Sequence, residues 1–321
     1  MKLIIQIPCF NEAETLPATL KELPRQMPGF SAVEWLVIND GSRDGTEEVA
    51  RRHGVDHVVS FTNNQGLARA FLAGLDAAVK LGADVIVNTD ADNQYQAADI
   101  PLLLAPILAG KADVVIGARP VGEITSFSPA KKFLQKLGSS VVRLVSKTEI
   151  PDAPSGFRAM TREAALRFNV FNDYTYTLET IIQAGQKNIA ITSVPIRVNG
   201  VLRPSRLVKS IPSYVRRSLV TIVRIFVVYK AFRFFMSLGV TIFVLGFLGG
   251  ARYLYYYAVG EGGGHVQSLI LASILLGVGF QTMLTAFLAD LLAVNRRLME
   301  DVQYRVKLLE HPGRGRGPGR G

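Results

Sequence analysis

The sequence has very few of the residues that form covalent cross-links or soft-metal sites. Its 321 residues include one cysteine, Cys9, one tryptophan, Trp35, and four histidines. A single cysteine excludes a disulfide within the chain and a cysteine-based zinc cluster. The first apolar run is too short for a secretory signal peptide, and no small-residue cleavage site follows it. We therefore expect the N-terminal part of the chain to stay in the cytoplasm.

Two nucleotide-binding motifs are also missing. No G-x-G-x-x-G pattern follows the first predicted strand, and the chain has no Walker lysine motif. A dinucleotide-dependent oxidoreductase and a P-loop enzyme are therefore disfavoured.

Acidic residues are outnumbered by basic ones. The chain has 26 Asp and Glu against 36 Lys and Arg, a formal net charge of +10, and 49% hydrophobic residues. The charge indicates an anionic partner, for which nucleic acid, acidic lipid and a phosphorylated substrate all qualify. The hydrophobic content indicates that some segment contacts lipid.

The first 205 residues have the pattern of an α/β domain. Short β-branched runs alternate with longer amphipathic stretches, which predicts βα units around a mostly parallel sheet. The predicted strands cover residues 3–7, 34–39, 57–61, 85–89 and 114–117, and the predicted helices cover 14–26, 46–53, 67–80 and 99–109.

The pattern changes after this domain. Residues 206–233 are basic and amphipathic, which favours a juxtamembrane helix, although a solvated helix face is the alternative. Residues 234–258 and 266–292 are each long and apolar enough to cross a membrane, which predicts a transmembrane hairpin. Their connector lacks Lys and Arg while both outer flanks are basic, so the positive-inside rule places both termini in the cytoplasm. Residues 293–321 form a tail with a disordered end.

Acidic residues follow two of the predicted strands. Asp40 comes after the second strand, and Asp90 and Asp92 come after the fourth. Ligands bind at the carboxyl ends of strands in open α/β sheets, and alternate residues of an extended segment share a face. Two carboxylates at this spacing suit Mg²⁺ or Mn²⁺ bound to phosphate oxygens. The alternative is that these aspartates cap helices.

Four motifs in order carry a family resemblance. They read IPCFNE (residues 7–12), VINDGSRDGT (37–46), DADNQ (90–94) and SGFR (155–158). The chain resembles the family 2 glycosyltransferases, specifically the polyprenyl-phosphate branch related to dolichyl-phosphate mannose synthase. The resemblance implies a Rossmann-like GT-A catalytic domain with a mostly parallel sheet, followed by the amphipathic juxtamembrane helix and the two-helix transmembrane hairpin.

The resemblance also implies where the donor binds. It places the donor nucleotide beside Pro8, Asn11, Glu12, Asp40 and Asp90. It assigns a Mg²⁺ or Mn²⁺ cofactor to Asp90, Asp92 and Gln94. In many relatives Leu and His stand where this chain has Asn93 and Tyr95, which puts the geometry of the metal loop in question.

On the acceptor side, the resemblance makes Asp152 and Asp92 catalytic residues. It assigns the contacts with acceptor phosphate and diphosphate to Arg119, Lys131, Lys132, Ser155, Arg158, Arg203 and Arg206. A phosphate acceptor is largely ionised at neutral pH, so Asp152 can either act as a general base or only orient groups. A turn aspartate, and for the two lysines a solvated helix face, are the alternatives.

The expected activity is transfer of one glycosyl unit from a UDP- or GDP-linked sugar to undecaprenyl or dolichyl phosphate at the cytoplasmic membrane face, inverting and metal-dependent. The expected partners are the nucleotide sugar, the polyprenyl phosphate and the bilayer, with a homo-oligomer left open. One alternative is a processive polysaccharide synthase, but the Q-x-x-R-W signature is missing. Another is a membrane-tethered nucleic-acid binder, which the acids at the strand ends disfavour, so no nucleic-acid partner is expected.

Overall fold

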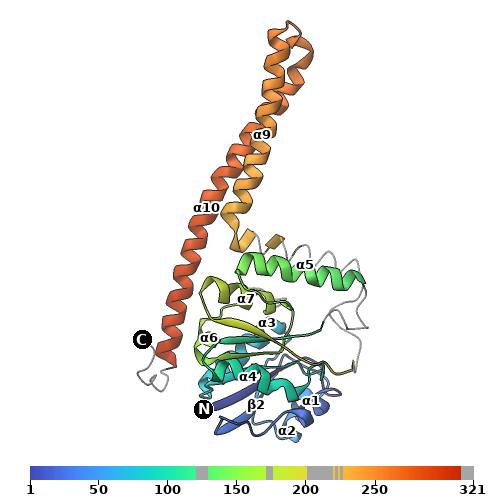
Figure 1. The fold of residues 1–321 in the computed structure, drawn as a ribbon, viewed down its shortest axis with the longest axis vertical. Helices are drawn as coiled ribbons and strands as arrows, with labels where there is room; N and C mark the ends of the chain where they lie inside the picture. Colours follow the sequence, from blue (N-terminus) through green and yellow to red (C-terminus); the bar gives the residue numbers. More distant parts are fainter. Residues whose placement is uncertain (121–128, 171–175, 201–219, 221–222, 225–226, 312–321) are drawn as a thin grey trace. The chain divides into compact units, whose positions relative to one another are not determined.

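The computed structural model describes residues 1–120, 129–170, 176–200, 220, 223–224 and 227–311, with the side chains of 129–137 left aside (Figure 1). The chain divides into two compact units. The first comprises Met1–Ser218 with Gln303–Gly321, and the second is Leu219–Val302.

A seven-stranded sheet forms the centre of the first unit. Its order is β3-β2-β1-β4-β6-β5-β7, and only β6 runs antiparallel to its neighbours. The strands are β1 (Lys2–Cys9), β2 (Ala32–Asn39), β3 (His57–Ser60), β4 (Val85–Asn88), β5 (Val114–Ala118), β6 (Arg158–Thr161) and β7 (Ile191–Pro195). The mostly parallel sheet confirms the predicted fold class, and the five predicted strands match β1 to β5.

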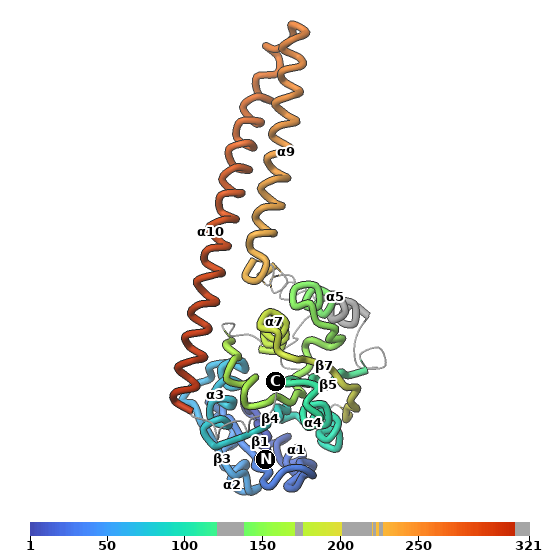
Figure 2. Tube along the Cα trace, turned by 60° about the vertical axis from the view of Figure 1, so that its left-hand side comes forward, coloured from blue at the N-terminus to red at the C-terminus, as the bar shows by residue number. Residues whose placement is uncertain are grey.

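Helices cover both faces of this sheet, as Figure 2 shows for α3 and α4. The helices of the first unit are α1 (Leu16–Glu22), α2 (Thr46–Arg52), α3 (Leu67–Lys80), α4 (Ile100–Leu108), α5 (Pro129–Ser146), α6 (Arg162–Arg167) and α7 (Thr177–Gln186), with a 3-10 turn η1 (Ala97–Asp99) before α4. Burial on both faces explains why the parallel strands β1, β2, β4 and β5 read as near-continuous apolar runs.

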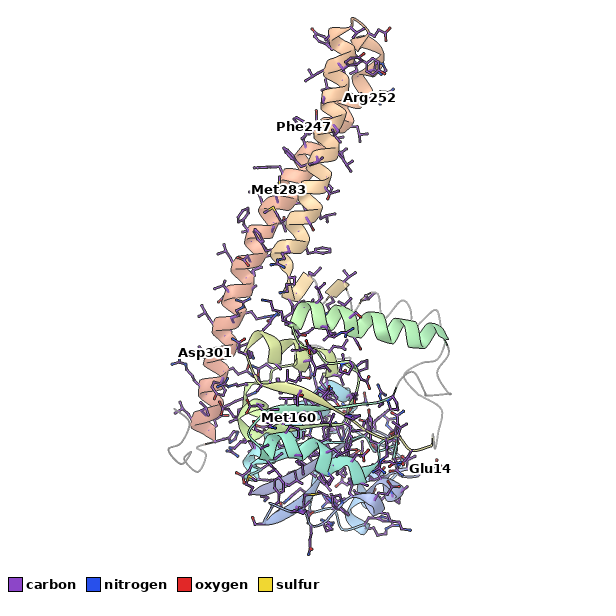
Figure 3. The ribbon with its side chains drawn as sticks, viewed as in Figure 1. Glu14, Met160, Phe247, Arg252, Met283 and Asp301 are labelled. Carbon is purple, nitrogen blue, oxygen red and sulfur yellow. The ribbon has the colours of Figure 1, made fainter. Side chains whose placement is uncertain are left out.

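Alternate residues of β1 show how the two layers form. Leu3, Ile5 and Ile7 pack in one core cluster with residues of α1 and α4. On the opposite face, Gly74 of α3 lies so close to β1 that a Cβ there would come 2.5 Å from Oε1 of Gln6. The sheet therefore has a packed core on each side. Met160 of β6 is fully buried in the interior of the first unit (Figure 3).

The second unit is a helical hairpin. It contains α9 (Ala231–Ala258), the 3-10 turn η2 (Gly262–His265) and most of α10 (Val266–Glu310). The two helices reach mean hydropathies of 2.0 and 1.9, and only 11% and 17% of their apolar windows are buried. Large side chains such as Phe247 project outward (Figure 3). Length and composition allow both helices to cross a membrane, and they contain the two apolar stretches predicted from the sequence.

Small residues form the contact between these two helices. The buried positions recur every seven residues: Gly239 and Gly246 on α9, and Ala272, Gly279 and Ala286 on α10. A Cβ on Gly279 would lie 2.6 Å from the Phe243 backbone nitrogen. Small residues allow the two backbones to approach closely. In lipid, where the hydrophobic effect does not hold helices together, this close packing stabilises their association.

The last turns of α10 belong to the first unit. Lys307 donates to the Phe168 carbonyl at 3.2 Å and to the Asn169 side chain at 3.0 Å, and burial lowers the pKa of this lysine. Within the predicted tail of residues 293–321, the part up to Glu310 is helical, and its last turns pack against the first unit. The predicted disordered end, and most of the juxtamembrane segment 206–233, lie outside the described residues.

The close packing of the hairpin leads to a first prediction. Gly279→Ala should destabilise the hairpin by about 1 to 3 kcal/mol, because the added methyl group must displace the α9 backbone. Gly277→Ala is the matched control, since no atom lies within 4 Å of the added Cβ and alanine favours the helix. Thermal unfolding of the purified chain in detergent measures both. Equal melting temperatures for the two variants would contradict the packing.

Candidate active site

Three loops with polar residues meet at one edge of the sheet. β1 pairs in parallel with β2 and with β4, with Cys9 opposite Asn39 and Gln6 opposite Asn88. The segments after these strands contain three of the motifs found in the sequence. The carboxyl edge of the sheet therefore gathers the predicted donor-side residues, as the topology of an open α/β sheet requires.

Hydrogen bonds join the first two loops. Asn11, with a φ of 53°, accepts from the Arg43 backbone at 2.9 Å, and its own N–H donates to Ser42 Oγ at 2.9 Å. The buried Glu12 donates its backbone N–H to Thr46 Oγ1 at 2.9 Å. The first motif thus has a fixed position against the second, and its residue Pro8 lies buried near the end of β1.

Asp40 holds the loop that leads into α3. Its carboxylate accepts from the backbone N–H groups of Gln65 at 2.6 Å and Gly66 at 2.9 Å. Burial raises the pKa of Asp40 even though these two bonds favour its charged form. Gly41, with a φ of 68°, allows the close approach, because a Cβ there would lie 2.4 Å from the Asn63 carbonyl carbon. The predicted contact of Asp40 with the nucleoside stays a prediction.

Asp90 and Asp92 form the acidic end of β4. Asp90 is partly buried, and desolvation together with the nearby charge of Asp92 raises the pKa of Asp90 to about 7. The Asp92 carboxylate accepts from the Gln94 backbone at 3.2 Å. Crowded carboxylates of this kind fit a divalent cation, whose charge would relieve their repulsion. Among the described residues no three His, Cys, Asp or Glu side chains are placed to hold one metal ion together, so other oxygen ligands would complete the coordination.

Gly156 brings a second loop against Asp90. A Cβ on Gly156 would lie 2.9 and 3.0 Å from the two carboxylate oxygens of Asp90. The Gly156 N–H donates to the Tyr95 hydroxyl at 3.0 Å, and its carbonyl accepts from Asn88 Nδ2 at 2.8 Å. Any larger residue at position 156 would force the Asp90 carboxylate to shift. Side chains next to the metal motif satisfy both backbone groups of Gly156.

Arg119 and Asp152 form a buried ion pair at this edge. Asp152 Oδ2 accepts from the Arg119 backbone N–H at 3.1 Å and from its Nε at 2.7 Å, and Oδ1 accepts from Nη2 at 3.0 Å. Their side chains are 7% and 2% exposed. The sequence resemblance gave these residues separate roles, whereas the structure makes each the principal partner of the other.

Ser155 and Arg158 have no exposed surface. Arg158 donates to Thr180 Oγ1 at 2.6 Å and lies over the Tyr176 ring at 5.1 Å, and burial lowers the pKa of its guanidinium. Both side chains would have to become accessible before they could contact phosphate. This predicted contact therefore stays a prediction. Lys131 and Lys132 lie on α5 with undescribed side chains, and Arg203 and Arg206 fall outside the described residues.

A buried network of polar side chains next to the site was not predicted from the sequence. Gln6 Nε2 donates to Asn88 Oδ1 at 2.8 Å, and Asn88 Nδ2 donates to the Tyr176 hydroxyl at 2.9 Å. The Tyr176 ring stacks on Phe71 with 3.8 Å between centroids. The only signal in the sequence was a polar residue inside each of two apolar strands, Gln6 and Asn88.

Comparison with known proteins defines the class of this fold and site. The sequence matches the model of glycosyl transferase family 2 over residues 4–167, and the chain belongs to this family. It is a glycosyltransferase.

Individual relatives give more detail. The chain is 29% identical to an undecaprenyl-phosphate mannosyltransferase of Micrococcus luteus over 206 residues, 61% of this chain and 83% of the relative. It is also 29% identical to a polyprenol monophosphomannose synthase of Mycolicibacterium smegmatis over 204 residues, 60% of this chain and 76% of the relative. Glucosyl-3-phosphoglycerate synthase from Mycobacterium tuberculosis, solved with Mn²⁺, UDP and glucosyl-3-phosphoglycerate, shares the fold. Its TM-score is 0.53 at 20% identity, and the match covers 69% of this chain and 79% of that structure.

The raised pKa of Asp90 predicts how stability depends on pH. In the metal-free protein, the pKa of Asp90 is about 7 in the folded state and 3.8 in the unfolded state. The folded state therefore loses stability as the pH rises from 3.8 to about 7, and the full loss is present above that pH. Asp90→Asn should therefore raise the melting temperature near pH 8 and leave it almost unchanged near pH 4. Thermal melts in detergent with a chelator measure this difference.

Asp44→Asn is the control with the opposite sign. Hydrogen bonds from Thr46 and Ala13 outweigh desolvation and lower the pKa of Asp44, so its stabilisation is present above 3.8 and is lost as the pH falls through the folded value. This variant should melt lower than the wild type near pH 8. A lower melting temperature for Asp90→Asn at that pH would refute the assignment of Asp90 as a destabilised carboxylate.

Proposed function

We propose that this chain transfers one glycosyl unit from a nucleotide-diphosphate sugar to a polyprenyl phosphate. The observation that carries the proposal is the meeting of the carboxylates Asp90 and Asp92 with the buried Arg119–Asp152 pair at one edge of the sheet, where Arg119 acts electrostatically on Asp90. An acidic metal site beside a guanidinium suits a reaction between two phosphorylated substrates.

The acceptor class is supported by the relatives and by the apolar helices. Two relatives are named for undecaprenyl phosphate and polyprenol monophosphomannose. A polyprenyl chain lies in the bilayer, and α9 and α10 are long and apolar enough to hold a catalytic domain there. Together these features favour a lipid-linked phosphate over a soluble acceptor.

A divalent cation, Mg²⁺ or Mn²⁺, belongs to this proposal. Asp90, Asp92 and Gln94 would hold it, and when bound it would neutralise the charge that develops on the leaving diphosphate. Structures that share the fold were solved with Mn²⁺ or Mg²⁺ and UDP. The donor nucleotide would lie along the loops that contain Asn11, Glu12 and Asp40.

The residues on the acceptor side then orient an ionised nucleophile. An acceptor phosphate with a second pKa near 6 is already largely ionised at neutral pH, so its oxygen can attack the anomeric carbon without a general base. The bond from that carbon to the diphosphate breaks on the opposite side, which inverts the configuration. Asp152 holds Arg119 through both carboxylate oxygens. We infer that Asp152 acts by orienting this arginine toward phosphate.

The membrane orientation follows from charge. The connector between α9 and α10 contains no Lys or Arg, whereas Arg296 and Arg297 follow the apolar part of α10. The tyrosines Tyr255 and Tyr257 near the end of α9 are 66% and 67% exposed, as expected of an aromatic belt at a membrane interface. The proposal places the catalytic domain and both termini in the cytoplasm.

Product analysis tests the proposed reaction. Purified chain is incubated with a panel of labelled UDP- and GDP-linked sugars, with polyprenyl phosphate or with the free polyprenol. One nucleotide sugar should label an organic-soluble product only with the phosphate acceptor. Labelling of polymer, or of polyprenol, would refute the acceptor assignment.

The metal assignment predicts the effect of a neutral amide. Asp92→Asn should lower kcat by roughly a hundredfold or more while the protein stays folded, because an amide binds a hard cation weakly. Asp76→Asn is the control, since Asp76 lies outside the metal motif and its exposed carboxylate pairs with Lys80 and His311. Initial rates with added Mn²⁺, and in EDTA, measure both effects. Full activity in EDTA would show that no metal is needed.

The buried ion pair predicts a split between the two substrates. Arg119→Ala should raise the acceptor KM and cost roughly 2 to 5 kcal/mol of transition-state stabilisation, with donor affinity almost unchanged. Asp152→Asn should keep measurable turnover, because an amide still accepts a hydrogen bond from Arg119.

Steady-state kinetics with each substrate varied separately check this split. Arg51→Ala is the control, because the Arg51 side chain is 63% exposed and lies outside the site. Loss of donor binding in Arg119→Ala would show that Arg119 binds the donor diphosphate and not the acceptor phosphate. Complete inactivity of folded Asp152→Asn would instead make the carboxylate a general base.

A further inference from the structure

Tyr95 occupies a buried position between the metal motif and a neighbouring loop. The residue is 4% exposed, and its ring stacks on Phe157 at 5.1 Å between centroids and 10° between planes. Its hydroxyl donates to the Asp90 carboxylate and accepts the Gly156 N–H at 3.0 Å. One hydroxyl therefore joins a proposed metal ligand to the backbone of another loop.

Gly156 is held from its other side as well. Asn88 Nδ2 donates to the Gly156 carbonyl at 2.8 Å and to the Tyr176 hydroxyl at 2.9 Å. Gly156 also lies beside Asp90, since a Cβ built on this glycine would fall 2.9 and 3.0 Å from the two carboxylate oxygens. Because both backbone groups are fixed, a shift of the Asp90 carboxylate must be transmitted to this peptide or must break a buried hydrogen bond.

The same loop contains the acceptor-side carboxylate. The Ser155 N–H donates to the Asp152 carbonyl at 3.3 Å, and Asp152 holds Arg119. The segment 152–157 is therefore a short connected stretch with Asp152 at one end and the Gly156 contact to Tyr95 at the other.

We propose that Tyr95 is a positioning residue that couples the metal-binding carboxylate Asp90 to the loop of residues 152–157. The metal on the donor side and the Arg119–Asp152 pair on the acceptor side then adopt their working geometry together. Packing alone does not account for the hydroxyl, because phenylalanine would stack on Phe157 equally well and would not bury a polar group. Residues that hold a metal ligand from outside typically change metal affinity or activity by about 10- to 100-fold when replaced.

This inference rests on the proposed function, but its first test needs no turnover. Hydrogen exchange of the full chain in detergent is followed with and without Mn²⁺, with no donor or acceptor. In the wild type, Mn²⁺ should slow exchange of the peptide spanning 152–157, on the order of tenfold. In Tyr95→Phe this slowing should disappear, while Tyr304→Phe, which keeps its ring against Arg167 far along the chain, should respond like the wild type.

The second test is kinetic. At saturating Mn²⁺ and substrates, Tyr95→Phe should lower kcat by about tenfold with little change in either KM. In an Asp152→Asn background the same substitution should have a smaller effect, since the contact with Arg119 that the loop positions is already weakened. A purely structural role would lower the melting temperature and give independent, multiplicative effects on kcat.

Three outcomes would overturn the coupling: no metal-dependent slowing at 152–157 in the wild type, the same slowing in Tyr95→Phe, or multiplicative kinetic effects. If Tyr95→Phe does not fold, the absence of slowing in the wild type still overturns the coupling, and Asp90→Asn, which removes the carboxylate that the Tyr95 hydroxyl bonds, should abolish the slowing instead. If the wild type transfers no sugar to polyprenyl phosphate, the proposed reaction fails while the exchange result still decides the coupling.

Discussion

The contact between the Gly156 backbone and the Asp90 carboxylate sets the geometry of the whole site. It exists because β6 runs antiparallel beside β4, with Arg158 opposite Asn88, so the loop just before β6 returns to the carboxyl edge where β4 ends. A side chain at position 156 would overlap both Asp90 oxygens. The glycine of the SGFR motif and the first aspartate of the DADNQ motif are therefore two halves of one contact.

Electrostatics explain why this contact leaves the site ready for a ligand. Burial raises the pKa of Asp90 and lowers that of Arg158, so groups of both signs lose favourable hydration on folding. The opposite charges of Arg119 and Asp152 neutralise each other, whereas the carboxylates of Asp90 and Asp92 repel each other. A folded state of this kind gains stability when a cation binds, which links the energetics of folding to the proposed chemistry.

Local patterns predicted part of this structure and could not predict the rest. The strands β1, β2, β4 and β5 were predictable because each is a mostly buried apolar run, and the edge strand β3 because of its paired valines Val58 and Val59. Asp90 and Asp92 were predictable because two acids follow such a run. The sequence reasoning did not identify β6 or β7, since polar residues interrupt both strands: β6 begins with Arg158, and β7 contains Thr192 and Ser193. In addition, β6 forms through pairing with distant strands. The same limit applies to the site, because Arg119 and Asp152 are 33 residues apart and Asn88 and Gly156 are 68 apart. Only the fold brings these pairs together, so the sequence indicated Arg119, Asp152 and the SGFR motif but not their partners.

The central claim is that the carboxyl end of β4 binds a divalent cation together with the diphosphate of the donor. Electron–nuclear double resonance on Mn²⁺ bound to the purified chain, with and without a nucleoside diphosphate, tests it most directly. The account predicts strong ³¹P hyperfine coupling that appears with the nucleotide and disappears in both Asp90→Asn and Asp92→Asn. Coupling that persists in these variants, or Mn²⁺ that binds without contact to the diphosphate, would contradict the account.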